Sequence, residues 1–124
     1  KRIKTDKSFQ TNVDNVYAQE IPLYSDKLQT AGRVDLIAEW NKQLAIIDFK
    51  TSRKPKKEEW IKNYFMQCAF YAAAFYERTG LIIRKSVIVI TVDHNEPQVF
   101  ITKPYDYLKD FIIVRQKYKK LYGI

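Results

Sequence analysis

The stretch LAIIDFKTS, residues 44–52, decides the fold, because its continuous apolar run predicts a strand buried on both faces of a sheet. Three aliphatic residues lead directly to Asp48, and Lys50 follows two positions later. Side chains at positions i and i+2 of a strand lie on the same face. We therefore expect Asp48 and Lys50 to lie side by side at the end of this strand, with Phe49 on the other face.

The residues on either side predict an α/β domain with a mixed sheet flanked by helices, in the order βββαββα. The expected strands cover 15–24, 28–40, 44–51, 86–92 and 99–102, and the expected helices cover 57–79 and 104–121. The segments YSDK and WNKQ read as turns between the first three strands. Pro104 is expected to open the second helix, because proline is tolerated in a first turn.

Apolar residues in the first helix recur at steps of three and four, which places them on one face. They are Ile61, Phe65, Cys68, Ala72 and Phe75. Gly80 follows as a natural stop for this helix. The helix is therefore expected to cover one face of the sheet.

The 124-residue chain is long enough for one compact domain, and its 46% hydrophobic content is enough for a single core. The net charge of +8 favours an anionic partner, nucleic acid or a membrane surface, although many equally basic proteins bind neither. Cys68 is the single cysteine, which excludes an internal disulfide and a cysteine-based zinc site and fits a reducing, intracellular compartment. No apolar run approaches the roughly 18 residues of a membrane span, and KRIKTDKSF at the N-terminus lacks the apolar core of a signal peptide.

Asp35 lies on the strand before Asp48, about as far from the WNKQ turn as Asp48 is. If the two strands form a hairpin, both carboxylates are neighbours across it. Adjacent carboxylates repel unless a positive charge lies between them, and a hard cation such as Mg²⁺ takes oxygen ligands. The pattern therefore favours metal-assisted phosphodiester hydrolysis, with Lys50 near the water or phosphate. The alternative for an isolated D-x-K is an ordinary salt bridge between Asp48 and Lys50.

Other residues could reach the same place. Gly32 interrupts a strand, which marks a bulge or a close backbone approach. Glu20 on the first strand is a third acid, or else a carboxylate that faces solvent. The expected helix carries a second stripe, which faces either a ligand or the core. Its members are Trp60, Tyr64, Gln67 and Tyr71. The basic run KTSRKPKK, with Arg53 and Lys54, either binds phosphates or is a solvated loop.

Three motifs occur in one order: GRVD (32–35), IIDFKTS (46–52) and QCAFY (67–71). Together they resemble the G-x-x-D, D/E-x-K-T and Q-x-x-x-Y motifs of RecB-like nucleases of the PD-(D/E)xK superfamily. The resemblance implies that Asp35, Asp48 and the backbone carbonyl of Phe49 bind Mg²⁺ or Mn²⁺, with Glu20 as a further acid.

The same resemblance implies that Lys50 is the catalytic lysine and that Thr51 supports it. It also implies that Gln67 and Tyr71 hold DNA or the catalytic geometry. Relatives commonly carry an N-terminal helical segment, often with a histidine at the metal site. Residues 1–124 are accordingly expected to be one nuclease domain. Either the N-terminal helical segment was removed from it, or the chain is a minimal version of the family's domain.

The sequence therefore predicts a metal-dependent DNA exonuclease that acts on ends of single-stranded DNA, in a bacterium, a phage-infected cell or a mitochondrion, with no membrane partner. A structure-selective endonuclease or resolvase on the same fold is the alternative among enzymes. A DNA-binding module with an incomplete catalytic site, or a protein-interaction domain, is the alternative outside them.

Overall fold

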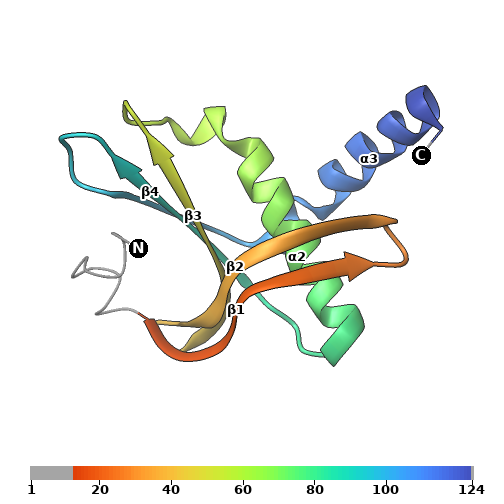
Figure 1. Cartoon of the computed structure of the whole chain (residues 1–124), viewed down its shortest axis with the longest axis horizontal. Coiled ribbons are helices and arrows are strands. Elements are labelled where there is room, and N and C mark those ends of the chain that lie inside the picture. The colour runs from red at the N-terminus through yellow and green to blue at the C-terminus, as the bar shows by residue number, and fades with distance from the viewer. Residues whose placement is uncertain (1–12, 124) are drawn as a thin grey trace.

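The computed structural model of the 124-residue chain describes residues 13–123 (Figure 1). The elements in chain order are β1 (Val13–Ser25), β2 (Thr30–Trp40), β3 (Gln43–Ser52), η2 (Glu58–Trp60), α2 (Lys62–Thr79), β4 (Lys85–Val92), β5 (Gln98–Thr102), η3 (Pro104–Asp106) and α3 (Leu108–Tyr122). The two η elements are short 3₁₀ helices. This order confirms the predicted α/β fold and its mixed sheet.

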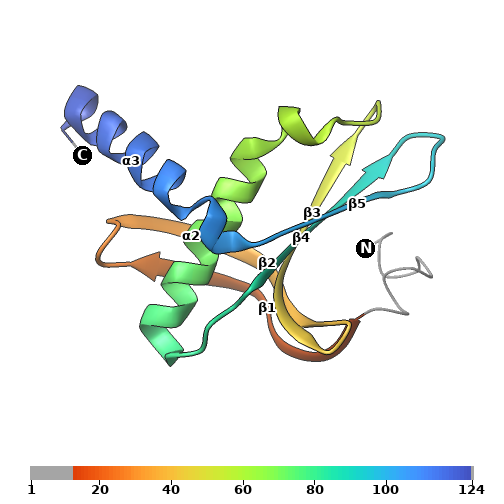
Figure 2. The ribbon, with the colours of Figure 1, turned by 180° about the vertical axis from the view of Figure 1, so that it is seen from behind.

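The five strands form one sheet in the order β1-β2-β3-β4-β5. Strands β3 and β4 pair in parallel, and the other neighbours pair antiparallel. The parallel pair needs a crossover connection, which α2 provides as it crosses one face of the sheet (Figure 1). Seen from behind, β5 leads into η3 beside α2 (Figure 2).

Strand β3 is buried on both faces, as its apolar run predicts. Ile46 belongs to the core cluster under α2, whereas Ala45 and Ile47 belong to a second cluster on the opposite face. All three side chains are fully buried. The strand is therefore held firmly up to the residue before Asp48.

The hairpin of β2 and β3 opens into a fork. Its ladder runs from Trp40–Gln43 to Leu36–Ile47 and includes no further pair. Beyond that point β2 pairs with β1, and β3 pairs with β4. Asp35 and Asp48 occupy the first position after the last pair, so the two acids stand where the strands separate.

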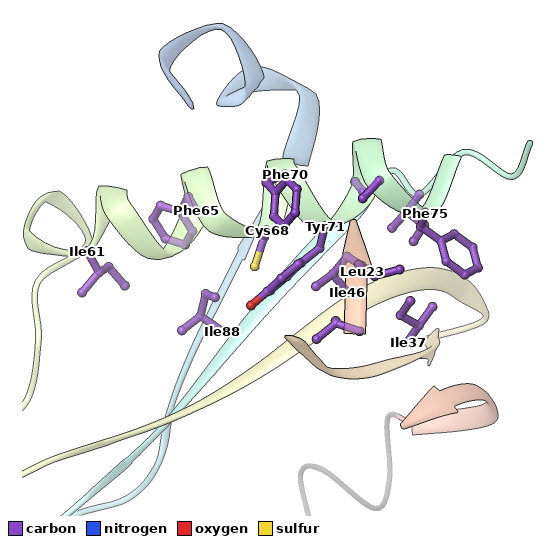
Figure 3. Packing of buried hydrophobic residues seen from close by; sticks show 14 of the residues in the cluster. Leu23, Ile37, Ile46, Ile61, Phe65, Cys68, Phe70, Tyr71, Phe75 and Ile88 are labelled. Atoms are coloured by element: carbon purple, nitrogen blue, oxygen red, sulfur yellow. The ribbon is translucent and has the colours of Figure 1, made fainter. Parts of the chain in front are cut away.

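Helix α2 packs over this fork through the predicted apolar face, whose five members are all buried. Figure 3 shows Phe70 and Tyr71 on the helix above the strands. A Cβ atom added at Gly32 would lie 3.1 Å from ring atoms of both Phe70 and Tyr71. The expected close approach at Gly32 is thus the contact between β2 and these two aromatic rings.

Three predicted boundaries were wrong. The first helix is broken at Ile61, because that side chain turns into the core and is only 1% exposed. Pro104 opens the 3₁₀ turn η3, and α3 begins at Leu108, because Tyr107 packs on Phe65 with ring centroids 5.2 Å apart and holds the turn against α2. The first turn covers 26–29, so that Leu28 precedes β2.

Helix α3 contacts α2 and the turn between β1 and β2. Phe111 stacks on Phe70 with centroids 5.5 Å apart, and Arg115 donates a 3.0 Å hydrogen bond to the carbonyl of Gln29. Among the described residues, no helix is long and apolar enough to cross a membrane.

Candidate active site

The two predicted carboxylates meet at the fork between β2 and β3. Asp35 Oδ2 accepts a 2.9 Å hydrogen bond from the backbone N–H of Phe49, the residue after Asp48. This bond takes the place of a ladder pair and spans the opening of the fork. The side chain of Asp35 is therefore fixed against β3, next to the carboxylate of Asp48.

Asp48 is a buried acid with an incomplete set of partners. The residue is only 3% exposed. Burial raises the pKa of its carboxyl group to about 6; Lys50 opposes this rise, and Asp35 adds to it. Lys50 Nζ lies 3.0 Å from Asp48 Oδ2 and forms an ion pair with it, and the described residues give that oxygen no further hydrogen bond.

Lys50 begins a chain of hydrogen bonds that ends on β2. Its Nζ donates to Gln67 Oε1 over 3.4 Å, and Gln67 Nε2 donates to the Tyr71 hydroxyl over 2.8 Å. The Tyr71 hydroxyl donates in turn to the backbone carbonyl of Arg33 over 2.8 Å. Figure 3 shows Tyr71 extending from α2 toward the strands. Gln67 and Tyr71 thus tie the helix to one arm of the fork and orient the lysine on the other.

Tyr64 joins the site although the sequence motifs do not include it. Lys50 Nζ lies 4.7 Å from the centroid of its ring, a cation–π contact. The signal was the helical stripe that Tyr64 shares with Gln67. Trp60 belongs to the same stripe but is 60% exposed, and it packs under Lys57 instead.

Glu20 and Thr51 lie at the margin of this group. Glu20 is exposed, has a φ of 50°, and stands opposite Asp35 by the register of its neighbours. Among the described residues, no group of three or more His, Cys, Asp and Glu side chains is arranged to hold a metal ion. Thr51 is exposed and, by strand alternation, faces away from Lys50. Direct roles for Glu20 and Thr51 stay predictions.

The basic loop after β3 is exposed but anchored at both ends. Ser52 Oγ bonds to the backbone of Lys54, and the Gln98 side chain bonds to both backbone groups of Lys56 over 2.8 and 2.9 Å. Arg53 and Lys54 are exposed, and neither forms an ion pair with another described residue. The loop therefore presents free cations from a defined backbone beside Lys50.

The donor set at the fork fits a hard divalent cation. Asp48 supplies a buried carboxylate whose Oδ2 is paired with the Lys50 ammonium, and Asp35 supplies a second carboxylate next to it. Mg²⁺ is commonly held by one or two carboxylates, with water and substrate phosphate completing its shell. Asp35 and Asp48 would hold such an ion, and the carbonyl of Phe49 is the third ligand that the motif predicts.

A family profile described as the PD-(D/E)XK nuclease superfamily matches residues 3–120. The match includes all five strands, α2, most of α3 and all three motifs.

The chain belongs to the PD-(D/E)XK nuclease superfamily.

One relative by sequence and one solved structure are similar to this chain. Mitochondrial genome maintenance exonuclease 1 from Xenopus tropicalis is 37% identical over 84 residues, which cover 59% of this chain and 24% of that protein. A crystal structure of a candidate exonuclease from Eubacterium rectale has a TM-score of 0.58 and 14% identity, over 94% of this chain and 47% of that one. The chain thus spans about a quarter of the first and half of the second.

Removing the Tyr71 hydroxyl tests how the helix holds the fork. In Tyr71→Phe the Arg33 carbonyl and Gln67 each lose a hydrogen bond, so we expect the free energy of unfolding to fall by about 1–3 kcal/mol. Urea denaturation measures this loss. Tyr76→Phe is the matched control, because Tyr76 is 48% exposed on the same helix. Equal stability of both variants would show that the bond chain does not hold the fork.

Proposed function

We propose that this domain is a metal-dependent DNA exonuclease that hydrolyses phosphodiester bonds at ends of single-stranded DNA. The observation that carries the proposal is Asp48, a buried acid kept next to Asp35 at a cost in folding stability, with Lys50 in contact. A group whose burial raises its pKa beside a specific charge partner marks a functional site. An ordinary surface salt bridge would be solvated on both sides.

Each side chain has a role that follows from its position. Asp48 and Asp35 would hold a divalent cation, Mg²⁺ or Mn²⁺, which when bound would supply Lewis acidity toward the phosphoryl oxygen and lower the pKa of water. Lys50 holds the attacking water or the negative charge that develops on the phosphate. The Lys50 side chain is 26% exposed, so it contacts Asp48 and is also accessible to substrate.

Gln67 and Tyr64 position Lys50, and Lys50 is the residue that contacts the phosphate. One accepts its hydrogen bond and the other lies under its charge, so both limit the directions in which Nζ can point. Tyr71 fixes Gln67, because its hydroxyl accepts a hydrogen bond from Gln67 and donates one to the Arg33 carbonyl on β2. Such positioning matters because a small displacement of a catalytic group lowers the rate strongly.

The substrate is expected to be DNA because the site is bordered by Arg53 and Lys54, which form no ion pair with another residue of 13–123. Arg53 and Lys54 lie three and four residues after Lys50 and can contact phosphates on either side of the scissile bond. The net charge of +8 favours any polyanion, and the exonuclease named among the relatives favours action on DNA ends.

The deciding assay uses labelled linear and circular single-stranded DNA with Mg²⁺, Mn²⁺ or EDTA. We expect linear strands to be degraded to short products with either metal, circular strands to stay intact, and EDTA to stop the reaction. Cleavage of the circle would favour the endonuclease alternative. Binding without cleavage under every metal would favour the DNA-binding module and refute the exonuclease.

A further inference from the structure

A cavity of about 560 Å³ lies at the end of the sheet where β3 and β4 begin. Its wall comes from the start of both strands, the end of β5 and the turn η3. Its lining residues are Gln43, Arg84, Lys85, Ile101, Thr102, Lys103, Pro104, Tyr105 and Asp106. The volume is in the range of small-ligand sites.

The cavity is cationic. Arg84, Lys85 and Lys103 line it with a single acid, Asp106, and among the described residues none of these four forms an ion pair. Unpaired cations that converge on one concave surface favour an anion there. Thr102 adds a hydroxyl whose oxygen is buried and has no hydrogen-bond partner in the described part of the chain.

An apolar extension adjoins the cationic wall. A second hollow of about 320 Å³ shares Arg84 and Tyr105 with the first and adds Tyr76 and Ile82. Tyr76, Ile82 and Tyr105 are 48%, 48% and 40% exposed. Exposed tyrosine rings stack on nucleic-acid bases irrespective of sequence.

The geometry points to a nucleotide-binding site, in which Arg84, Lys85 and Lys103 hold a phosphate and Tyr105 with Tyr76 receives the base. The ligand is a nucleoside monophosphate unit, either free or within a single strand. This site lies apart from the fork: Gln43 is the first residue of β3, whereas Asp48 and Lys50 lie in its second half. At about 3.3 Å per residue, five residues separate the two sites by roughly 16 Å along the strand.

Binding in EDTA tests this site without cleavage, so its outcome does not depend on the proposed nuclease activity. The variant Arg84→Gln/Lys103→Gln should bind a fluorescent dA12 strand at least fivefold more weakly at 50 mM salt. Its salt dependence should lose a slope of about 1.4, the share of two phosphate contacts with a single strand. The control Lys27→Gln/Lys120→Gln removes the same charge from exposed positions elsewhere and should bind within about twofold of wild type.

Titration of ¹⁵N-labelled protein separates the two sources of the nucleotide. Shifts of the Thr102 and Lys103 amides with free dAMP identify a mononucleotide site, and shifts with dA12 alone identify a strand site. Tyr105→Ala should weaken whichever of these ligands binds, while the fold stays intact by melting temperature. Equal weakening in both double variants, or no shift at these amides with either ligand, overturns the proposal.

Discussion

Replacing Asp48 by asparagine is expected to lower DNA cleavage at least about 1,000-fold and, in EDTA, to raise the melting temperature. The cleavage falls because the neutral amide cannot replace a carboxylate as a ligand for a hard cation. The melting temperature rises because burial disfavours the charged form of the Asp48 carboxyl group, even with Lys50 3.0 Å away, and a neutral amide avoids that cost. Asp14→Asn, an exposed change on β1, is the control and should alter neither value.

The pH dependence of metal-free stability checks the same residue. Burial raises the pKa of folded Asp48 to about 6, above the model-peptide value of 3.8, so the folded state keeps its proton longer. The free energy of unfolding should therefore fall as pH rises from about 4 to 6, by roughly 2–3 kcal/mol from this group. Asp48→Asn should lack this component. Addition of Mg²⁺ should stabilise wild type and leave the variant unchanged.

A finding that Asp48→Asn digests DNA like wild type would remove the metal-centred mechanism. A variant that is inactive but less stable in EDTA would show instead that Asp48 serves the fold. These readouts separate the catalytic from the structural role, because a structural acid loses activity and stability together.

Replacing Lys50 by glutamine is expected to reduce the cleavage rate at least about 100-fold while Mg²⁺ still raises the melting temperature. The ammonium lies 3.0 Å from Asp48 and also contacts Gln67 and Tyr64, so its position is set by three neighbours. Glutamine removes its charge from the transition state but leaves both carboxylates. Differential scanning fluorimetry with and without Mg²⁺, beside single-turnover kinetics, measures the two effects.

Arginine at position 50 should not restore the rate. The planar guanidinium of arginine spreads its charge over several N–H groups whose geometry matches a carboxylate. The site between Gln67 and Tyr64 holds a compact ammonium instead. Lys117→Gln removes the same charge from an exposed position on α3 and should cut normally. Full activity of Lys50→Arg would show that any cation suffices here.

The sequence by itself determined the strands, the covering helix and the candidates at their ends. Strand β3 could be predicted because an uninterrupted apolar run is stable only when buried on both faces, and Ile46 and Ile47 are indeed buried on opposite faces. The apolar face of α2 and its stop at Gly80 followed from helical periodicity and from the left-handed conformation that glycine adopts, with a φ of 75°. These features depend on residues close in the chain.

Only the tertiary structure decided how the two carboxylates are held next to each other. Strand alternation places Asp48 and Lys50 on one face. It does not show that the ladder between β2 and β3 ends at Leu36–Ile47, one pair before Asp35 and Asp48, or that Asp35 accepts a hydrogen bond from the Phe49 amide. The role of Tyr71, a bond to the Arg33 carbonyl 38 residues away, likewise needs α2 to cross the sheet. The cavity for which we propose a nucleotide joins residues from β3, β4, β5 and η3 and has no motif in the sequence. Such contacts depend on packing between distant segments, which local patterns do not encode.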